Sequence, residues 1–551
     1  MNVGTFREIL FWPLSLQGGT TDDIERSLDE DGRWKEWPHP FAGTASAIAG
    51  HEGDQQRLAT QYAAAVYMHP FVQKLLYPHR PHGDAGRPVL RRFRATGDHL
   101  PKRIRVTLSG TTQTEISFRV DRLELSLFRT GVVILQADLW CETPNLSLAV
   151  AQQCLDEVRR CYVPFWKGNA PGQVPASVAV DHATRTQTWT APTHRPDLDM
   201  HNSPAGLAPT LLPWWAALLA PLSLTPAADG AYLSHVVDDR LPGMAFLTLD
   251  DPTALGAADW VRLCFADPPG SGLPHARSFL PDFAGAHCYD RFWDPTGADW
   301  MRSRYLLAGY QFTFVGREEG FTVDVLQDHF RHHYADMALV LQYQQAALLR
   351  LMERLTPSGD GRLSDPEFRQ RLRNAQDEWL DFLGHGWFPT LSNQVQGQEL
   401  FEKWRDQMRL PTLYREVSEK ARDMTALLNA AEGHEATQAG LRLNMIATLG
   451  IIAALIAGLL GINLFLPGQA GDLLSTETPV TAAHGAALML VISIGTFLSG
   501  SACLYITRIK PAGNGDKASD MRFLTAVAIN CLAIACLTFA VGGTLAYFVT
   551  H

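Results

Sequence analysis

Residues 443–471 read LNMIATLGIIAALIAGLLGINLFLPGQAG and contain no charged side chain. Residues 523–550 are also free of charged side chains, and residues 478–507 contain only His484 as an ionisable group. Crossing the hydrocarbon core of a bilayer takes roughly 20 apolar helical residues, and each run is longer than that. The pattern predicts three C-terminal transmembrane helices. The alternative is three buried helices of a large globular fold.

The charges that flank these runs predict an orientation. The range 508–522 carries four lysine and arginine residues, and Arg442 precedes the first run. The range 467–484 carries only the acidic residues Asp472 and Glu477. Because positive flanks stay in the cytoplasm, we expect the large N-terminal part inside, the 467–484 loop outside and the 508–522 loop inside.

Composition limits the other possibilities. The chain has 551 residues, with 47 Lys and Arg against 57 Asp and Glu, for a net charge of −10. This length favours two or more structural units. Without a basic excess, a nucleic-acid partner is not expected.

The first 320 residues predict a cytoplasmic α/β domain. Leu123, Leu125 and Leu127 alternate with polar residues, and a turn at 129–131 leads into the apolar run 132–135, so the pattern predicts a β-hairpin. A helix should follow, with Asn145 as its N-cap. Residues 310–315 predict a last strand.

After residue 320 the pattern becomes helical. We expect helices over about 322–355, 364–383 and 392–409, and then one proline-free helix that continues into the first membrane span. In that helix Leu413, Val417, Met424 and Leu428 form a heptad-like seam, which favours packing between identical subunits; an intrachain helical hairpin is the alternative. The expected parts are the α/β domain 1–320, the helices 321–411, the long stalk helix with transmembrane helix 1 at 412–466, the external loop 467–484, transmembrane helix 2 at 485–507, the cytoplasmic loop 508–522 and transmembrane helix 3 at 523–549. The expected fold class is therefore an α+β/α membrane protein.

The end of the first run carries the motif most informative about function. Residues 456–463 read IAGLLGIN, and Pro467 follows. Together with the long preceding helix and the acidic loop, this segment resembles the CorA-type divalent metal cation transporter family. Gly461-Ile462-Asn463 stands where that family has Gly-Met-Asn, and it resembles the variant of the zinc-transporting branch. The third run and the long N-terminal region depart from the family pattern.

The resemblance implies a homo-oligomeric, pentameric metal ion channel in lipid of the bacterial inner membrane. Its cargo would be Mg²⁺, Zn²⁺, Co²⁺ or Ni²⁺, and no other cofactor is expected. A ring of Asn463 amides could hold a hydrated dication at the mouth, and Asp472 and Glu477 would attract cations. The expected pore-lining residues are Leu443, Ala447, Ile451, Ala454 and Gly458. Asn463 as a helix C-cap, and small residues serving helix packing alone, are the alternatives.

Two groups of residues are candidate metal ligands, one acidic and one rich in histidine. By family resemblance, Glu416, Glu419 and Asp423 would sense intracellular metal between subunits; a solvated charged face is the alternative. Helical ligand spacing also occurs at Asp328, His329, His332, His333 and Asp336.

An enzyme is not expected. The sequence contains no Gly-Lys-Ser/Thr phosphate loop, no GxSxG elbow, no HExxH and no GxGxxG. The alternative to transport is a ligand-responsive membrane effector or scaffold on a CorA-like framework, whose enlarged N-terminal domain binds a small molecule or a protein.

Overall fold

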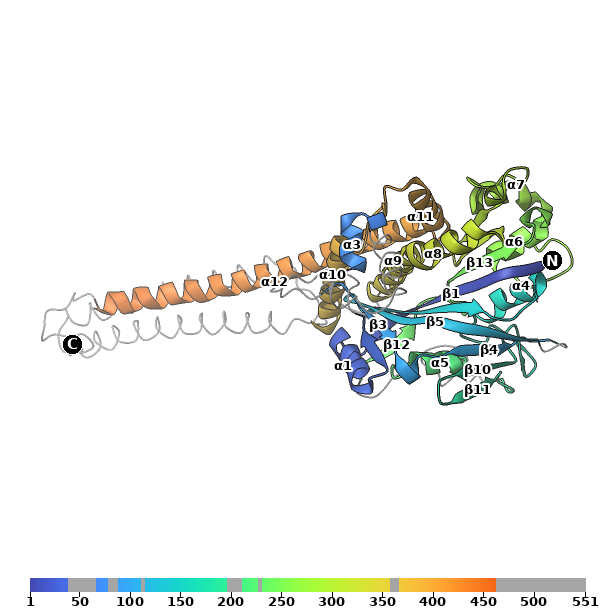
Figure 1. Cartoon of the computed structure of the whole chain (residues 1–551). Helices are drawn as coiled ribbons and strands as arrows, with labels where there is room; N and C mark the ends of the chain where they lie inside the picture. Colours follow the sequence, from blue (N-terminus) through green and yellow to red (C-terminus); the bar gives the residue numbers. More distant parts are fainter. Residues whose placement is uncertain are drawn as a thin grey trace, which may run out of the picture. The chain divides into compact units, whose positions relative to one another are not determined.

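The structure is a computed structural model of the 551-residue chain (Figure 1). It describes residues 1–37, 66–77, 88–110, 114–195, 211–225, 230–356 and 366–461. The chain divides into two compact units, Met1–Thr425 and Ala426–His551.

The Met1–Thr425 unit is built on a 14-stranded mixed sheet. Its main path runs β11-β10-β4-β5-β6-β1-β13-β16-β15-β14, with β2 and β3 joined through β5 and with β7 and β12 paired to β1. Neighbours are antiparallel except β13 and β16, which run parallel. The strands are β1 (Asn2–Gln17), β2 (Trp34–Glu36), β3 (Leu90–Ala95), β4 (Arg103–Thr107), β5 (Glu115–Phe128), β6 (Val132–Cys141), β7 (Leu146–Ser147), β10 (Ser177–Asp181), β11 (Thr186–Thr190), β12 (Tyr232–His235), β13 (Gly243–Leu249), β14 (Cys288–Tyr289), β15 (Arg304–Ala308) and β16 (Gln311–Arg317). A separate small ribbon pairs β8 (Trp166–Lys167) with β9 (Ala170–Pro171).

The central strand β1 joins distant parts of the chain. It pairs with β6 on one side and with β13 on the other, and its ends pair with β7 and β12. Alternate side chains enter opposite cores: Phe6, Leu10 and Trp12 one core, Ile9 and Phe11 the other. This alternation follows from the two-residue period of a strand.

Helices cover both faces of the sheet (Figure 1). One core includes side chains of α1, α4, α5, α6 and α7, and the other includes those of α3, α9, α10, α11 and the start of α12. The helices are α1 (Thr21–Asp31), α3 (Pro70–Leu76), α4 (Leu148–Glu157), α5 (Pro213–Leu219), α6 (Ala257–Phe265), α7 (Leu280–His287), α8 (Gln327–His329), α9 (Ala335–Arg354), α10 (Pro366–His385), α11 (Val395–Gln407) and α12 (Leu410–Gly461). Short 3₁₀ turns occupy Gly97–His99, Pro252–Ala254, Arg277–Phe279 and Asp299–Met301, and π-helical turns occupy Thr322–Leu326 and Phe330–Tyr334.

The structure confirms the expected hairpin. Strands β5 and β6 pair in antiparallel register across the turn at Gly131. The last strand is also confirmed, as β16. The expected N-cap of the next helix is wrong, because Asn145 has a positive φ of 55° and Ser147 caps α4 through the backbone N–H of Val150 at 3.3 Å.

Replacing Gly131 with alanine should destabilise the hairpin. Gly131 has φ +81°, and a Cβ there would lie 2.8 Å from Nη2 of the buried Arg350. We expect Gly131→Ala to lower the free energy of unfolding of the full chain by roughly 1–3 kcal/mol in denaturant titrations. Gly285→Ala in α7 is the control, because its Cβ would meet nothing within 4 Å. Equal stability of the two variants would contradict this prediction.

Leu413, Val417 and Met424 of the heptad-like seam pack within the Met1–Thr425 unit. Val417 and Ala421 belong to the same buried core as α9 and α11, and Leu413 and Met424 pack against that core. These side chains therefore favour the intrachain alternative. The expected self-association of the chain stays a prediction, and these side chains do not support it.

The predicted membrane fold class is wrong. The structure is a sheet-rich mixed fold, and among the residues it describes no helix is both long enough and apolar enough to cross a bilayer. Helix α12 is continuous from Leu410 to Gly461 as expected, and its charged residues Arg422, Asp423 and Arg442 precede the first apolar run. The expected transmembrane character is corrected with it, whereas metal cation transport and the pentamer stay predictions that these observations do not test. The ranges 485–507 and 523–549 lie outside the described residues.

Candidate functional site

Four residues of the predicted ion pathway lie beyond the described part of the chain. Ile462, Asn463, Asp472 and Glu477 fall in this group, and Gly461 is the last residue of α12. Ile451, Ala454 and Gly458 lie in α12, but the structure does not describe what surrounds their side chains. Leu443 and Ala447 are exposed. Cation transport through these residues therefore stays a prediction.

The predicted metal ligands do not form a site within one chain. Glu416, Glu419 and Asp423 are all exposed on α12. In the His-rich helix, Asp336 is already bound by Arg92 Nη2 at 2.8 Å and by the hydroxyl of Tyr77. In the described ranges, no group of three His, Cys, Asp or Glu side chains could hold a metal ion. Metal sensing between subunits remains untested.

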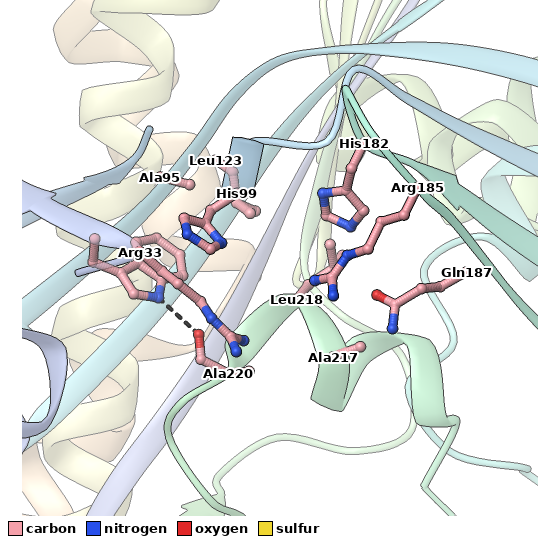
Figure 2. Close-up of a pocket in the computed structure, with 11 residues that line it drawn as sticks. Arg33, Ala95, His99, Leu123, His182, Arg185, Gln187, Ala217, Leu218 and Ala220 are labelled. Atoms are coloured by element: carbon pink, nitrogen blue, oxygen red, sulfur yellow. Dashed lines mark hydrogen bonds between the residues drawn. The ribbon is translucent and has the colours of Figure 1, made fainter. Parts of the chain in front are cut away.

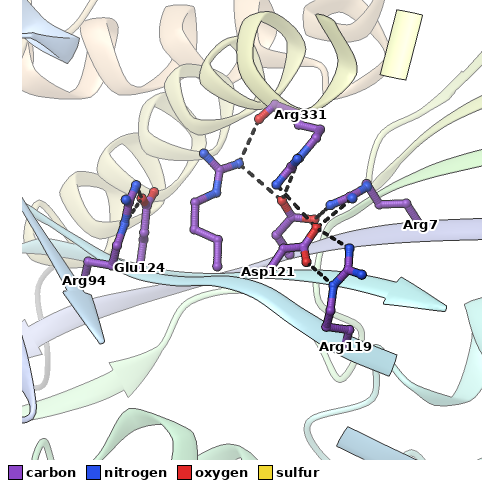
Figure 3. A network of polar contacts seen from close by, with 8 residues as sticks. Arg7, Arg94, Arg119, Asp121, Glu124 and Arg331 are labelled. Carbon is purple, nitrogen blue, oxygen red and sulfur yellow. Dashed lines mark hydrogen bonds and ion pairs between the residues drawn. The ribbon is translucent and has the colours of Figure 1, made fainter. Parts of the chain in front are cut away.

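A buried ion-pair network ties the π-helical turn Phe330–Tyr334 to the sheet (Figure 3). Asp138 on β6 accepts from Arg7 on β1, and its second oxygen lies 3.5 Å from Nε of Arg331. Asp121 on β5 accepts from Arg7 Nη2 at 2.7 Å and from Arg119 Nε at 2.6 Å. Arg7 and Asp138 are fully buried. Sequence reasoning missed this network because its members are far apart in the chain.

The electrostatic potential within the network is positive. Burial raises the pKa of Asp121, but Arg119, Arg7 and Arg331 outweigh it and hold that pKa at about 2. Burial and then the guanidinium groups of Arg122 and Arg331 lower the pKa of His332 to about 2. Since these arginines are engaged with carboxylates inside the protein, the network holds the helix on the sheet and offers no open ligand site.

An open pocket of about 240 Å³ gathers arginine and histidine side chains that the network does not use (Figure 2). His182 and Arg185 lie on one side, and Arg33 and His99 lie on the other, with their polar ends directed into the same space. Besides Trp34 and Gln187, the rest of the lining consists of apolar residues of β3, β5 and the segment 217–220 at the end of α5. They are Ala95, Leu123, Ala217, Leu218 and Ala220.

Local structure explains how these side chains come together. Gly32 ends α1 in a left-handed conformation, with φ 72°, and turns the chain so that Arg33 precedes β2. The next residue, Trp34, is buried and anchors this turn by donating from Nε1 to the carbonyl of Ala220 at 2.8 Å. His182 and Arg185 lie in the β10–β11 turn, which the backbone hydrogen bond from His182 to Arg185 closes at 2.8 Å.

The charge of the pocket is predominantly positive. Arg33 is partly neutralised by Asp31, with Nε and Oδ1 2.9 Å apart. Asp181, beside the turn, is held instead by Arg105 at 2.8 and 3.1 Å, and this pairing lowers the pKa of Asp181. In the part of the chain that the structure describes, no carboxylate lies within ion-pair distance of Arg185. Guanidinium and imidazole donors around a small hollow suit an anion with several oxygens.

The sequence carried little signal for this pocket. Its two arginine and two histidine residues come from three separate segments and follow no recognised spacing. Only the pairing of β2 with β3 and of β10 with β4 brings these segments together.

Comparison of the chain with family models, with curated proteins and with solved structures finds no match.

Proposed function

We propose that the chain is a ligand-responsive protein whose Met1–Thr425 unit binds a small phosphate-bearing anion. The observation that carries the proposal is the convergence of Arg33, His99, His182 and Arg185 on one pocket of about 240 Å³. Such a volume suits a phosphate with a small attached group, because it lies below the roughly 300–1,000 Å³ of drug-sized ligand pockets. This function develops the effector alternative that the sequence left open.

Binding of inorganic phosphate and of a nucleoside monophosphate to the purified full chain tests the proposal. We expect both to bind by isothermal titration calorimetry, and Arg185→Ala to weaken binding about tenfold or more, because a hydrogen bond to a charged group contributes about 1.5–3 kcal/mol. Added salt should weaken binding further. Arg185 is exposed, so its loss should leave the fold intact.

Arg26→Ala is the matched control, because Arg26 is exposed on α1 and pairs only with Asp23 among the described residues. It should leave phosphate affinity unchanged. Absence of phosphate binding, or equal affinity in the Arg185 and Arg26 variants, would overturn the proposal. Stabilisation of the chain by Mg²⁺ and not by phosphate would favour the metal-dependent alternative.

A further inference from the structure

A second cavity, of about 590 Å³, lies elsewhere in the Met1–Thr425 unit. Segments around β15, the helical range 319–329 and α11 supply its walls. Four aromatic residues dominate the lining: Phe292, Trp300, Tyr305 and Phe321. An aromatic hollow of this size with a few polar groups is typical of a small-molecule site.

The aromatic walls differ in exposure. Trp300 is 45% exposed and Phe321 is 49% exposed, although side chains of this size are usually buried. Tyr305 is buried, and its hydroxyl accepts from Gln396 Nε2 at 3.1 Å. Gln396 also donates to the hydroxyl of Tyr334 at 2.9 Å, so the inner wall is held in place by hydrogen bonds.

The charge of the polar side chains that line the cavity is negative. Glu319 accepts from the backbone N–H groups of Phe321 at 3.0 Å and of Thr322 at 2.8 Å. Burial raises the pKa of Glu319, but a hydrogen bond from the Thr322 hydroxyl at 2.7 Å and the two backbone hydrogen bonds outweigh it. The pKa therefore lies below its usual value, and the carboxylate is ionised at neutral pH. Burial lowers the pKa of His329, which is therefore neutral there. None of the described residues that line the cavity is lysine or arginine.

The helix beside the cavity is irregular. Phe321 directly precedes the π-helical turn Thr322–Leu326, and a second π-helical turn follows at Phe330–Tyr334. Isolated π-helical turns are uncommon and occur often at functional sites. The irregular helix places Phe321, Leu326 and His329 on the lining.

We propose that this cavity binds an organic cation with an apolar body. The aromatic walls would contact the apolar body and the face of the ammonium group, since rings attract cations through their negative faces. The Glu319 carboxylate would supply the counter-charge. This site is separate from the phosphate pocket in its residues and opposite to it in charge.

Three benzyl compounds of different charge test the proposal on the purified full chain. In calorimetry we expect benzyltrimethylammonium to bind more tightly than benzyl alcohol, and benzylsulfonate to bind least. Glu319→Gln should weaken binding of the cation about tenfold and should change benzyl alcohol binding little. The glutamine keeps an oxygen acceptor for the Thr322 N–H. Trp300→Ala should weaken all binding, because it removes part of the wall.

Phe165→Ala, which removes a different exposed aromatic side chain, is the control and should bind like the wild type. The proposal fails if the alcohol binds as tightly as the cation, if no benzyl compound binds, or if Glu319→Gln leaves cation affinity unchanged. Phosphate binding measured in the same Glu319 variant keeps this outcome distinct from a failure of the anion pocket.

Discussion

Asp138→Asn is expected to lower the free energy of unfolding of the full chain by about 3–5 kcal/mol. The carboxylate is fully buried and contacts three guanidinium groups, those of Arg7, Arg122 and Arg331. Asparagine keeps the shape but removes the charge, so Asp121 alone would compensate Arg7 and Arg331 within the network. Denaturant titration followed by circular dichroism measures the loss.

Two further variants separate this effect from a general loss of charge. Asp299→Asn removes an exposed carboxylate that also pairs with arginines, so we expect a loss below about 1 kcal/mol. Adding Arg331→Gln to Asp138→Asn should restore part of the lost stability, because it removes one of the positive charges that Asp138 compensates. Similar losses in the Asp138 and Asp299 variants would falsify this account of the network.

Glu8→Gln is expected to stabilise the chain increasingly as the pH rises from about 4.5 to about 8. Glu8 is fully buried on β1, and within the described residues neither of its carboxylate oxygens has a hydrogen-bond partner. Burial raises its pKa to about 8, and the attraction of Arg159 offsets this only in part.

The sign of the pH dependence follows from the protonation of Glu8 in the folded and in the unfolded chain. Between pH 4.5 and 8 the unfolded chain loses the Glu8 proton while the folded chain keeps it, so ionisation favours unfolding. The wild type should therefore lose up to about 1.4 kcal/mol per pH unit relative to Glu8→Gln, and the difference should level off above pH 8. Melting temperatures of both proteins across this range provide the measurement.

The control for Glu8 is Glu30→Gln. Glu30 is exposed near the end of α1, so its charge is solvated in the folded and the unfolded chain alike. We expect its stability to follow the wild type at each pH. A constant difference between Glu8→Gln and wild type across the range would show that the buried carboxyl does not titrate as described.

Local patterns predicted the elements that depend on near neighbours. The β5–β6 hairpin was legible because apolar residues alternate on both sides of the turn at Gly131, and the helices from 322 to 409 were legible from their apolar spacing. The strand β1 was missed, because Arg7, Glu8 and Pro13 interrupt its apolar pattern. Arg7 and Glu8 are tolerated there only because β5, β6 and α4, which are distant in the chain, supply partners or burial for their side chains.

The functional interpretation rested on one end of the chain, most of which lies outside the described residues, so it stays a prediction. Hydropathy of residues 443–550 favoured transmembrane helices, whereas among the described residues no helix is both long enough and apolar enough to span a bilayer. The pocket around Arg185 could not be foreseen, because arginine and histidine in turns are common and only the strand order brings these four together.

The central position of β1 has a consequence for biosynthesis. This apolar strand leaves the ribosome before β6 begins at Val132 and long before β13 begins at Gly243. At about 5–20 residues per second, β1 waits on the order of ten seconds for its first long partner. During that interval the nascent chain exposes an unpaired, aggregation-prone segment, so we expect chaperones that bind apolar nascent chains to engage it.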